Sequence, residues 1–160
     1  TVSLMGNTLQ KQVCDGTKGS STIQGQPQAM SEADIEKLKS NAEFCPQMHY
    51  SSLGHKIEVK GIEDIEGKKA YQLEITPKAG NKFSEYYDTE TGLLVREVKV
   101  DGEGENIATM TSDLSDYKDV KGLLVPHKIV ISGTMPMPLE AIVKSVKINE
   151  EIPDSEFKVD

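Results

Sequence analysis

The sequence contains no tryptophan and few other aromatic residues, with three Phe and five Tyr among its 160 residues. Arginine is nearly absent as well, because Arg96 is the one arginine among 18 basic residues. Nucleic-acid recognition favours the rigid guanidinium fork of arginine, and a chain with a formal net charge of −8 repels a polyanion. The composition therefore excludes nucleic acid as a partner.

Long apolar runs are missing too. The longest are short stretches such as Leu123–Val125 and Ile129–Ile131, whereas a membrane-spanning helix needs about 20 apolar residues. The amino terminus does not read as a signal peptide, and the first residue is Thr1 instead of Met. We therefore expect no membrane-spanning segment, and we expect the sequence to be a piece of a longer protein.

Cysteine is scarce, since Cys14 and Cys45 are the only two and lie far apart in the sequence. This spacing excludes a Cys-x-x-Cys redox or zinc motif. Outside the cytosol the two residues could form a disulfide, which would contribute about 3–4 kcal/mol in the chain-entropy model. The alternative is a pair of small buried thiols, and the spacing leaves both open.

Motifs that carry catalysis or bind cofactors are also lacking. His49, His55 and His127 do not have the spacing of a zinc peptidase, and no serine lies in a nucleophile elbow. We interpret His49 and His55 as surface or sheet residues and His127 as a hydrogen-bonded core residue. The sequence therefore predicts no catalytic residue, no metal ligand and no cofactor site in this chain.

What the sequence does contain is the period-2 alternation of β-strands. This alternation predicts strands over residues 1–15, 55–61, 69–76, 93–101, 123–132 and 139–149. Two turns share one pattern, with Asp64 three residues before Gly67 and Asp119 three residues before Gly122. A glycine suits a tight hairpin because such a turn needs a positive φ. Short strands separated by such turns predict an antiparallel sheet.

One helix is well marked. Ser31 is the expected N-cap, and Asp34 lies at the capping-box position. Ile35 and Leu38 begin a narrow apolar stripe, and Pro46 ends the segment because proline cannot continue a helix. The stripe predicts that this helix lies on a sheet.

The first strand begins abruptly, with apolar residues from Val2 onward. A sheet that starts in this way leaves an unpaired edge strand, and such edges pair with other chains. We therefore expect a dimer, or an exchange of strands, through this edge.

Several motifs together resemble a known family. Residues 86–97 and 116–128, and the ending from Val146 to Phe157, resemble the strand–turn–strand motifs of LolA/LolB-like outer-membrane lipoprotein-sorting proteins. More narrowly, residues 6–13 and 61–71 look like the version of this domain that lies C-terminal to insulinase/pitrilysin-type zinc peptidases of Bacteroidetes.

The resemblance implies a mainly β (α+β) fold, in which a curved antiparallel sheet forms an unclosed half-barrel wrapped around one helix. It implies one LolA-like domain over residues 1–160 whose upstream helix and first strands are missing. An apolar groove would follow the concave face of the sheet, with a lid loop formed by Met135, Pro136, Met137 and Pro138. The residues expected to line this groove are Ile35, Leu38, Tyr71, Leu73, Leu94, Val98, Val125, Ile129 and Val146.

By the same resemblance we expect a non-catalytic accessory domain of a periplasmic or secreted zinc peptidase. Its groove would serve a lipid, a peptide or a partner such as the upstream peptidase domain, which would carry the metal. One alternative is a stand-alone periplasmic carrier of lipid or lipoprotein acyl chains. Another is a structural domain with a filled core and no ligand.

Overall fold

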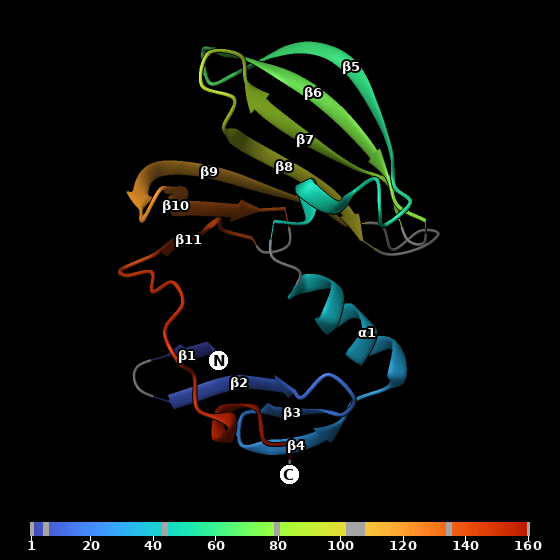
Figure 1. Cartoon of the computed structure of the whole chain (residues 1–160), viewed down its shortest axis with the longest axis vertical. Coiled ribbons are helices and arrows are strands. Elements are labelled where there is room, and N and C mark those ends of the chain that lie inside the picture. The colour runs from blue at the N-terminus through green and yellow to red at the C-terminus, as the bar shows by residue number, and fades with distance from the viewer. Residues whose placement is uncertain are drawn as a thin grey trace. The chain divides into compact units, whose positions relative to one another are not determined.

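The structure is a computed structural model that describes residues 2–4, 7–42, 45–78, 81–101, 108–133 and 136–159. The chain divides into two compact units. The first comprises Thr1–Pro46 and Asn149–Asp160, and the second comprises Gln47–Ile148. Each unit has its own antiparallel sheet (Figure 1).

The first unit holds a four-stranded sheet in the order β1-β2-β3-β4. Its strands are β1 (Val2–Leu4), β2 (Asn7–Cys14), β3 (Gly19–Ile23) and β4 (Gln26–Ala29). The helix α1 (Glu32–Asn41) follows β4, and the short 3-10 helix η2 (Asp154–Phe157) lies near the carboxyl terminus. The single strand expected over residues 1–15 is two strands, β1 and β2, which pair with each other. Strand β1 lies at an edge of the sheet, and the dimer through this edge stays a prediction.

The predicted capping box of α1 is confirmed. The Ser31 hydroxyl oxygen accepts the backbone N–H of Asp34 at 3.2 Å, and Asp34 Oδ2 accepts the backbone N–H of Ser31 at 3.0 Å. A Cβ on Gly19 would lie 3.0 Å from both Ile35 Cγ1 and Met30 Sδ. Ile35 of the apolar stripe thus lies against β3, and a larger residue at position 19 would require Ile35 or Met30 to shift.

The carboxylate of Asp15 stabilises the turn between β2 and β3. We therefore expect the stability of the protein to depend on Asp15 at low pH. Asp15 Oδ1 accepts the backbone N–H groups of Lys18 and Thr17, each at 2.7 Å, and these bonds lower the pKa of Asp15 from 3.8 to about 2. A carboxyl group whose pKa is lower in the folded state contributes stability that is lost as the pH falls through this range. We expect the thermal midpoint of Asp15→Asn to fall less than that of the wild type between about pH 4 and pH 2. Parallel curves for the two proteins would contradict this assignment.

The second unit holds a seven-stranded antiparallel sheet in the order β11-β10-β9-β8-β7-β6-β5 (Figure 1). Its ends, β5 and β11, are not paired with each other. The expected mainly β fold with an unclosed antiparallel sheet is therefore confirmed. The strands are β5 (Lys56–Ile65), β6 (Lys68–Thr76), β7 (Phe83–Asp88), β8 (Leu94–Asp101), β9 (Ala108–Val120), β10 (Leu123–Ser132) and β11 (Leu139–Ile142).

The two predicted hairpins are confirmed at β5–β6 and β9–β10. Gly67 has φ 83° and Gly122 has φ 87°, conformations that other residues rarely adopt. In both turns the preceding aspartate accepts the glycine N–H, at 2.7 Å for Asp64 and 3.2 Å for Asp119. The same local chemistry therefore closes both hairpins.

The last predicted strand, over residues 139–149, is wrong in length, because β11 ends at Ile142. The Val143 N–H still bonds the His127 carbonyl oxygen at 2.9 Å. Backbone groups alternate in direction along a strand, so the next carbonyl of β10 that points toward β11 belongs to Val125. This carbonyl oxygen instead lies 2.9 Å from the His127 ring nitrogen Nδ1, and the ladder stops there.

The core of the second unit is small. Ile65, Ala70 and Tyr86 form a buried cluster, against which Val95 and Val98 pack. His127 is also buried, with 7% of its surface exposed, and its ring is hydrogen-bonded, which confirms the interpretation made from the sequence.

Candidate functional site

The register of the strands assigns each residue of the seven-stranded sheet to one of its two faces. Residues directly opposite each other in an antiparallel ladder share a face. Glu85 of β7 lies opposite Glu97 of β8, and Tyr86 lies opposite Arg96, which in turn lies opposite Asp113 of β9. We call the first side the Glu85 face and the second the Arg96 face.

A fully buried acidic side chain lies at the centre of the Glu85 face. Glu85 has 0% of its surface exposed, and three side chains donate hydrogen bonds to it. Its Oε1 accepts the Tyr50 hydroxyl at 2.6 Å and the Gln47 amide at 3.2 Å, and its Oε2 accepts the Tyr87 hydroxyl at 2.8 Å. A buried polar group is tolerated when it is bonded in this way.

The two tyrosines that donate to Glu85 both have raised pKa values. Burial, and next the hydrogen bond to Glu85, raises the pKa of Tyr50 far above its ordinary value. Burial, and next the charge of Glu85, raises the pKa of Tyr87 in the same direction. Both phenols therefore stay protonated at any physiological pH.

A second carboxylate lies beside Glu85. Glu97 is directly opposite it in the ladder, a placement of like groups that weakens a sheet. Glu97 is compensated by Lys99, whose ammonium lies 2.9 Å from it and 5.6 Å from the centre of the Phe83 ring. The hydrogen-bond donors of Glu85 and the cation of Glu97 thus stabilise two adjacent acidic side chains.

The segment Gln47–His55, which we call the strap, lies over this part of the sheet. Its Tyr50 is buried, with 6% of its surface exposed, whereas Met48 is 81% exposed. The Tyr50 ring stacks on His55 with 5.3 Å between ring centres and meets Phe83 edge-on at 6.1 Å. The short 3-10 helix η1 (Pro46–His49) leads into this contact.

An exposed apolar surface lies on the same face, along the edge strand β5. Ile57 is 45% exposed, Val59 70%, Ile62 55% and the neighbouring Tyr71 of β6 45%. We call these four side chains the apolar strip. The strip continues into the buried part of the sheet, because Ile57 lies opposite Ile75, which is fully buried. Clustered exposed apolar side chains of this kind mark binding surfaces.

The structure brings many of the expected groove residues onto the Glu85 face. By register and alternation, this face carries Tyr71, Leu73, Leu94, Val125 and Ile129. Val98 lies on the other face, because it is opposite Ser84 and packs against the buried cluster of Ile65, Ala70 and Tyr86. A groove on the Glu85 face would therefore not include Val98.

The other expected groove residues lie outside the seven-stranded sheet. Val146 is half-buried in the segment that follows β11. Ile35 and Leu38 are half-buried side chains of α1, which belongs to the first unit, and the structure describes a close approach of Ile35 to Gly19 there.

The expected lid and disulfide residues are placed only in part. Met135 lies outside the described residues, while Pro136, Met137 and Pro138 are exposed, Met137 by 76%. Cys14 and Cys45 are free thiols, and both are half-buried.

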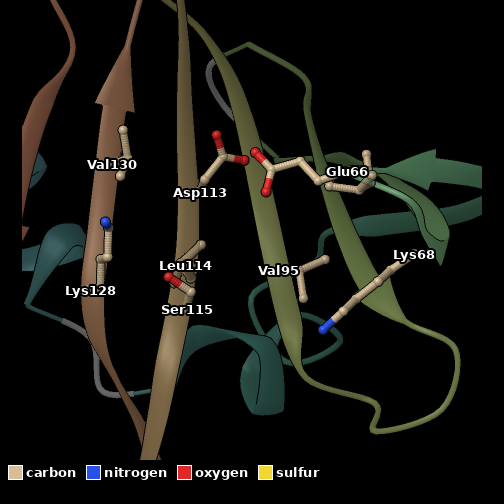
Figure 2. Close-up of a pocket in the computed structure, with 9 residues that line it drawn as sticks. Glu66, Lys68, Val95, Asp113, Leu114, Ser115, Lys128 and Val130 are labelled. Carbon is tan, nitrogen blue, oxygen red and sulfur yellow. The ribbon is translucent and has the colours of Figure 1, made fainter.

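A separate hollow of about 400 Å³ opens on the Arg96 face (Figure 2). Its lining includes Glu66, which extends toward Asp113 in the figure, and the ammonium of Lys128. Two of its charged lining residues are paired, because Asp113 forms an ion pair with Arg96 and the Lys128 ammonium lies 2.7 Å from a Glu140 carboxylate oxygen. The hydrogen bond to Asp113 also raises the pKa of Arg96. The hollow is thus lined by side chains of both charges, and it gives no sign of a particular ligand.

Comparison with known protein families, curated proteins and solved structures finds no match. The resemblance to LolA/LolB-like domains therefore stays a prediction. Within the described part of the chain, no group of three or more His, Cys, Asp or Glu side chains could hold a metal ion. None of the helices described is long and apolar enough to span a membrane.

Sequence reasoning missed the residues at the centre of this face, namely Gln47, Tyr50, Glu85 and Glu97. The sequence does carry a signal for Glu85. It alternates with Phe83 and Tyr87, so in a strand its side chain points to the same face as these two aromatic rings. No such signal marks Gln47 or Tyr50, because their contacts with Glu85 join segments that are distant in the sequence.

Proposed function

We propose that this chain is a non-catalytic accessory domain of a periplasmic or secreted zinc peptidase. Its Glu85 face offers an apolar surface to a lipid, a peptide or a partner domain. In this proposal the fold is the LolA/LolB-like half-barrel wrapped around one helix. The non-catalytic part rests on the sequence, which carries no nucleophile or zinc-peptidase motif.

The observation that carries the proposal is the apolar strip. Its four side chains share one face and expose between 45% and 70% of their surfaces, and one of them, Ile57, lies opposite the buried Ile75. Charged side chains protect sheet edges from unwanted contacts, and β5 carries Lys56 and Glu58 on its other face. On the Glu85 face, isoleucine and valine project from the same strand. Burying such side chains contributes about 25 cal/mol for each Å² of apolar surface.

The strip can be tested with Ile62→Asp and the environment-sensitive dye ANS. We expect the variant to bind ANS at least about tenfold more weakly than the wild type, a loss of about 1.4 kcal/mol, because a carboxylate resists burial in an apolar contact. Fluorescence titration measures the two dissociation constants. A dye that binds both proteins equally would overturn the apolar site.

A matched control separates this site from a general effect of charge. Ile142→Asp makes the same change in the other edge strand, β11, where Ile142 is 57% exposed on the Arg96 face, against 55% for Ile62. This control should bind ANS like the wild type. Native mass spectrometry of the purified protein then distinguishes a lipid ligand from a partner domain, since a lipid would co-purify as an added small mass and a domain would not.

A further inference from the structure

The strap has one buried side chain, Tyr50, on the Glu85 face, while Gln47 reaches Glu85 from an exposed position. Tyr50 is 6% exposed, whereas residues 51–54, which follow it in the strap, are exposed. The Tyr50 ring occupies a site between His55 and Phe83. Most of the strap therefore touches solvent, and Tyr50 acts as a plug.

The hydrogen bonds of Glu85 are divided between the strap and the sheet. Oε1 accepts both bonds from the strap, those of Tyr50 and Gln47, and Oε2 accepts the bond from Tyr87 of the same strand as Glu85. Release of the strap would therefore free one carboxyl oxygen and leave the other bonded within the sheet.

The strap also carries its own backbone hydrogen bonds. The Leu53 N–H donates to the His49 carbonyl at 2.8 Å, and the His55 N–H donates to the Tyr50 carbonyl at 2.8 Å. These bonds close short turns within the strap, so they open when Tyr50 leaves its site and the strap is released. Segments with few buried contacts open at low cost in free energy.

The plug lies close to the apolar strip. Phe83, which contacts Tyr50, lies opposite Ile75, and Ile75 lies opposite Ile57 of the strip. Adjacent strands are about 4.8 Å apart, so one continuous row of apolar side chains joins the strip to the site of Tyr50. An apolar chain bound along this row would extend from the strip toward the plug.

We propose that the strap gates the Glu85 face, with Tyr50 occupying part of the apolar site until a ligand displaces it. This inference rests on the proposed function, because it assumes that the strip binds an apolar ligand. The hydrogen bond between Tyr50 and Glu85 is the latch that keeps the gate closed.

The latch is tested by Tyr50→Phe, with Tyr87→Phe as the matched control. Each variant removes one hydroxyl that donates to Glu85, but only Tyr50 joins the strap to the sheet. We expect the amide protons of Leu53 and His55 to exchange at least about tenfold faster in Tyr50→Phe, because the hydrogen bond that joins Tyr50 to the sheet is lost. In Tyr87→Phe the same amides should change less than about twofold. Equal acceleration in both variants would overturn the latch.

Binding provides the second readout. If the strap must open before a ligand enters, the apparent dissociation constant falls by the factor by which the open population rises. ANS should therefore bind Tyr50→Phe more tightly, by the same factor as the gain in amide exchange. Faster exchange without tighter binding would overturn the gate, whereas failure of the proposed function would appear separately, as equal ANS binding by Ile62→Asp and the wild type.

Gln47→Ala tests the role of the strap if Tyr50→Phe does not fold. Gln47→Ala removes the weaker bond of the strap, at 3.2 Å, from a side chain that is exposed and fills no core position. We expect a smaller gain in exchange and in ANS affinity, with the two factors again equal. No gain in either would overturn the role of the strap.

Discussion

Replacing Glu85 by leucine is expected to lower the free energy of unfolding by roughly 2–6 kcal/mol, even though leucine is apolar and similar in size. The loss follows from the hydroxyls of Tyr50 and Tyr87, which donate to Glu85 at 2.6 and 2.8 Å. Each buried donor left without an acceptor costs about 1–3 kcal/mol. Urea denaturation of the wild type and Glu85→Leu measures the difference, provided that the slope of the transition is unchanged.

The control is the triple variant Glu85→Leu/Tyr50→Phe/Tyr87→Phe. Removing both hydroxyls together with their acceptor leaves no unsatisfied donor, so most of the lost stability should return. The three sites are in direct contact, and their effects are therefore not expected to add. A triple variant no more stable than Glu85→Leu would show that shape, and not hydrogen bonding, makes Glu85 necessary.

Truncating Ile75 to alanine is expected to lower the free energy of unfolding by about 2–5 kcal/mol, because the removed carbons leave a cavity in a packed interior. Ile75 is fully buried in β6, between Ile57 of β5 and Phe83 of β7. Urea denaturation again provides the measurement.

The matched control for this prediction is Ile57→Ala. It makes the same chemical change at the residue directly opposite Ile75, where 45% of the side chain is exposed. The expected loss is below about 1 kcal/mol, since little apolar surface is removed from the interior. Equal losses at both positions would contradict the burial that separates them.

The elements that were predicted correctly from the sequence are those whose signals are local. The capping box of Ser31 and Asp34 lies within four consecutive residues, and each hairpin turn is marked by an aspartate and a glycine three residues apart. A hydrogen bond between near neighbours in the chain depends mainly on residue type and spacing. Such features can therefore be read without knowing the rest of the fold.

Strand β9 shows why other elements were missed. Its residues Ala108–Val120 include Thr, Ser, Asp and Lys side chains, and their burial pattern does not alternate clearly. The strand exists because β8 and β10 pair with it on both sides and satisfy its backbone groups. Pairing of this kind depends on segments distant in the sequence, and apolar periodicity does not report it.

The candidate site follows the same division. Alternation placed Tyr71 and Leu73 on one face of the sheet, and their shared face is confirmed by register. The position of Val98 could not be predicted in this way. Simple alternation puts Leu94 and Val98 on the same face, but a bulge in the pairing of β7 with β8 places Val98 on the Arg96 face.

The sequence by itself determined that this chain is a mainly antiparallel β protein with one capped helix, and its charge is the basis of the prediction that nucleic acid is not a partner. These properties depend on composition, on charge and on neighbours within a few residues. Only the tertiary structure decided that Tyr50 and Gln47 meet Glu85 over the centre of a sheet. These contacts span 35 and 38 residues of chain, and they form because a buried acidic group must find its hydrogen-bond donors wherever the fold brings them.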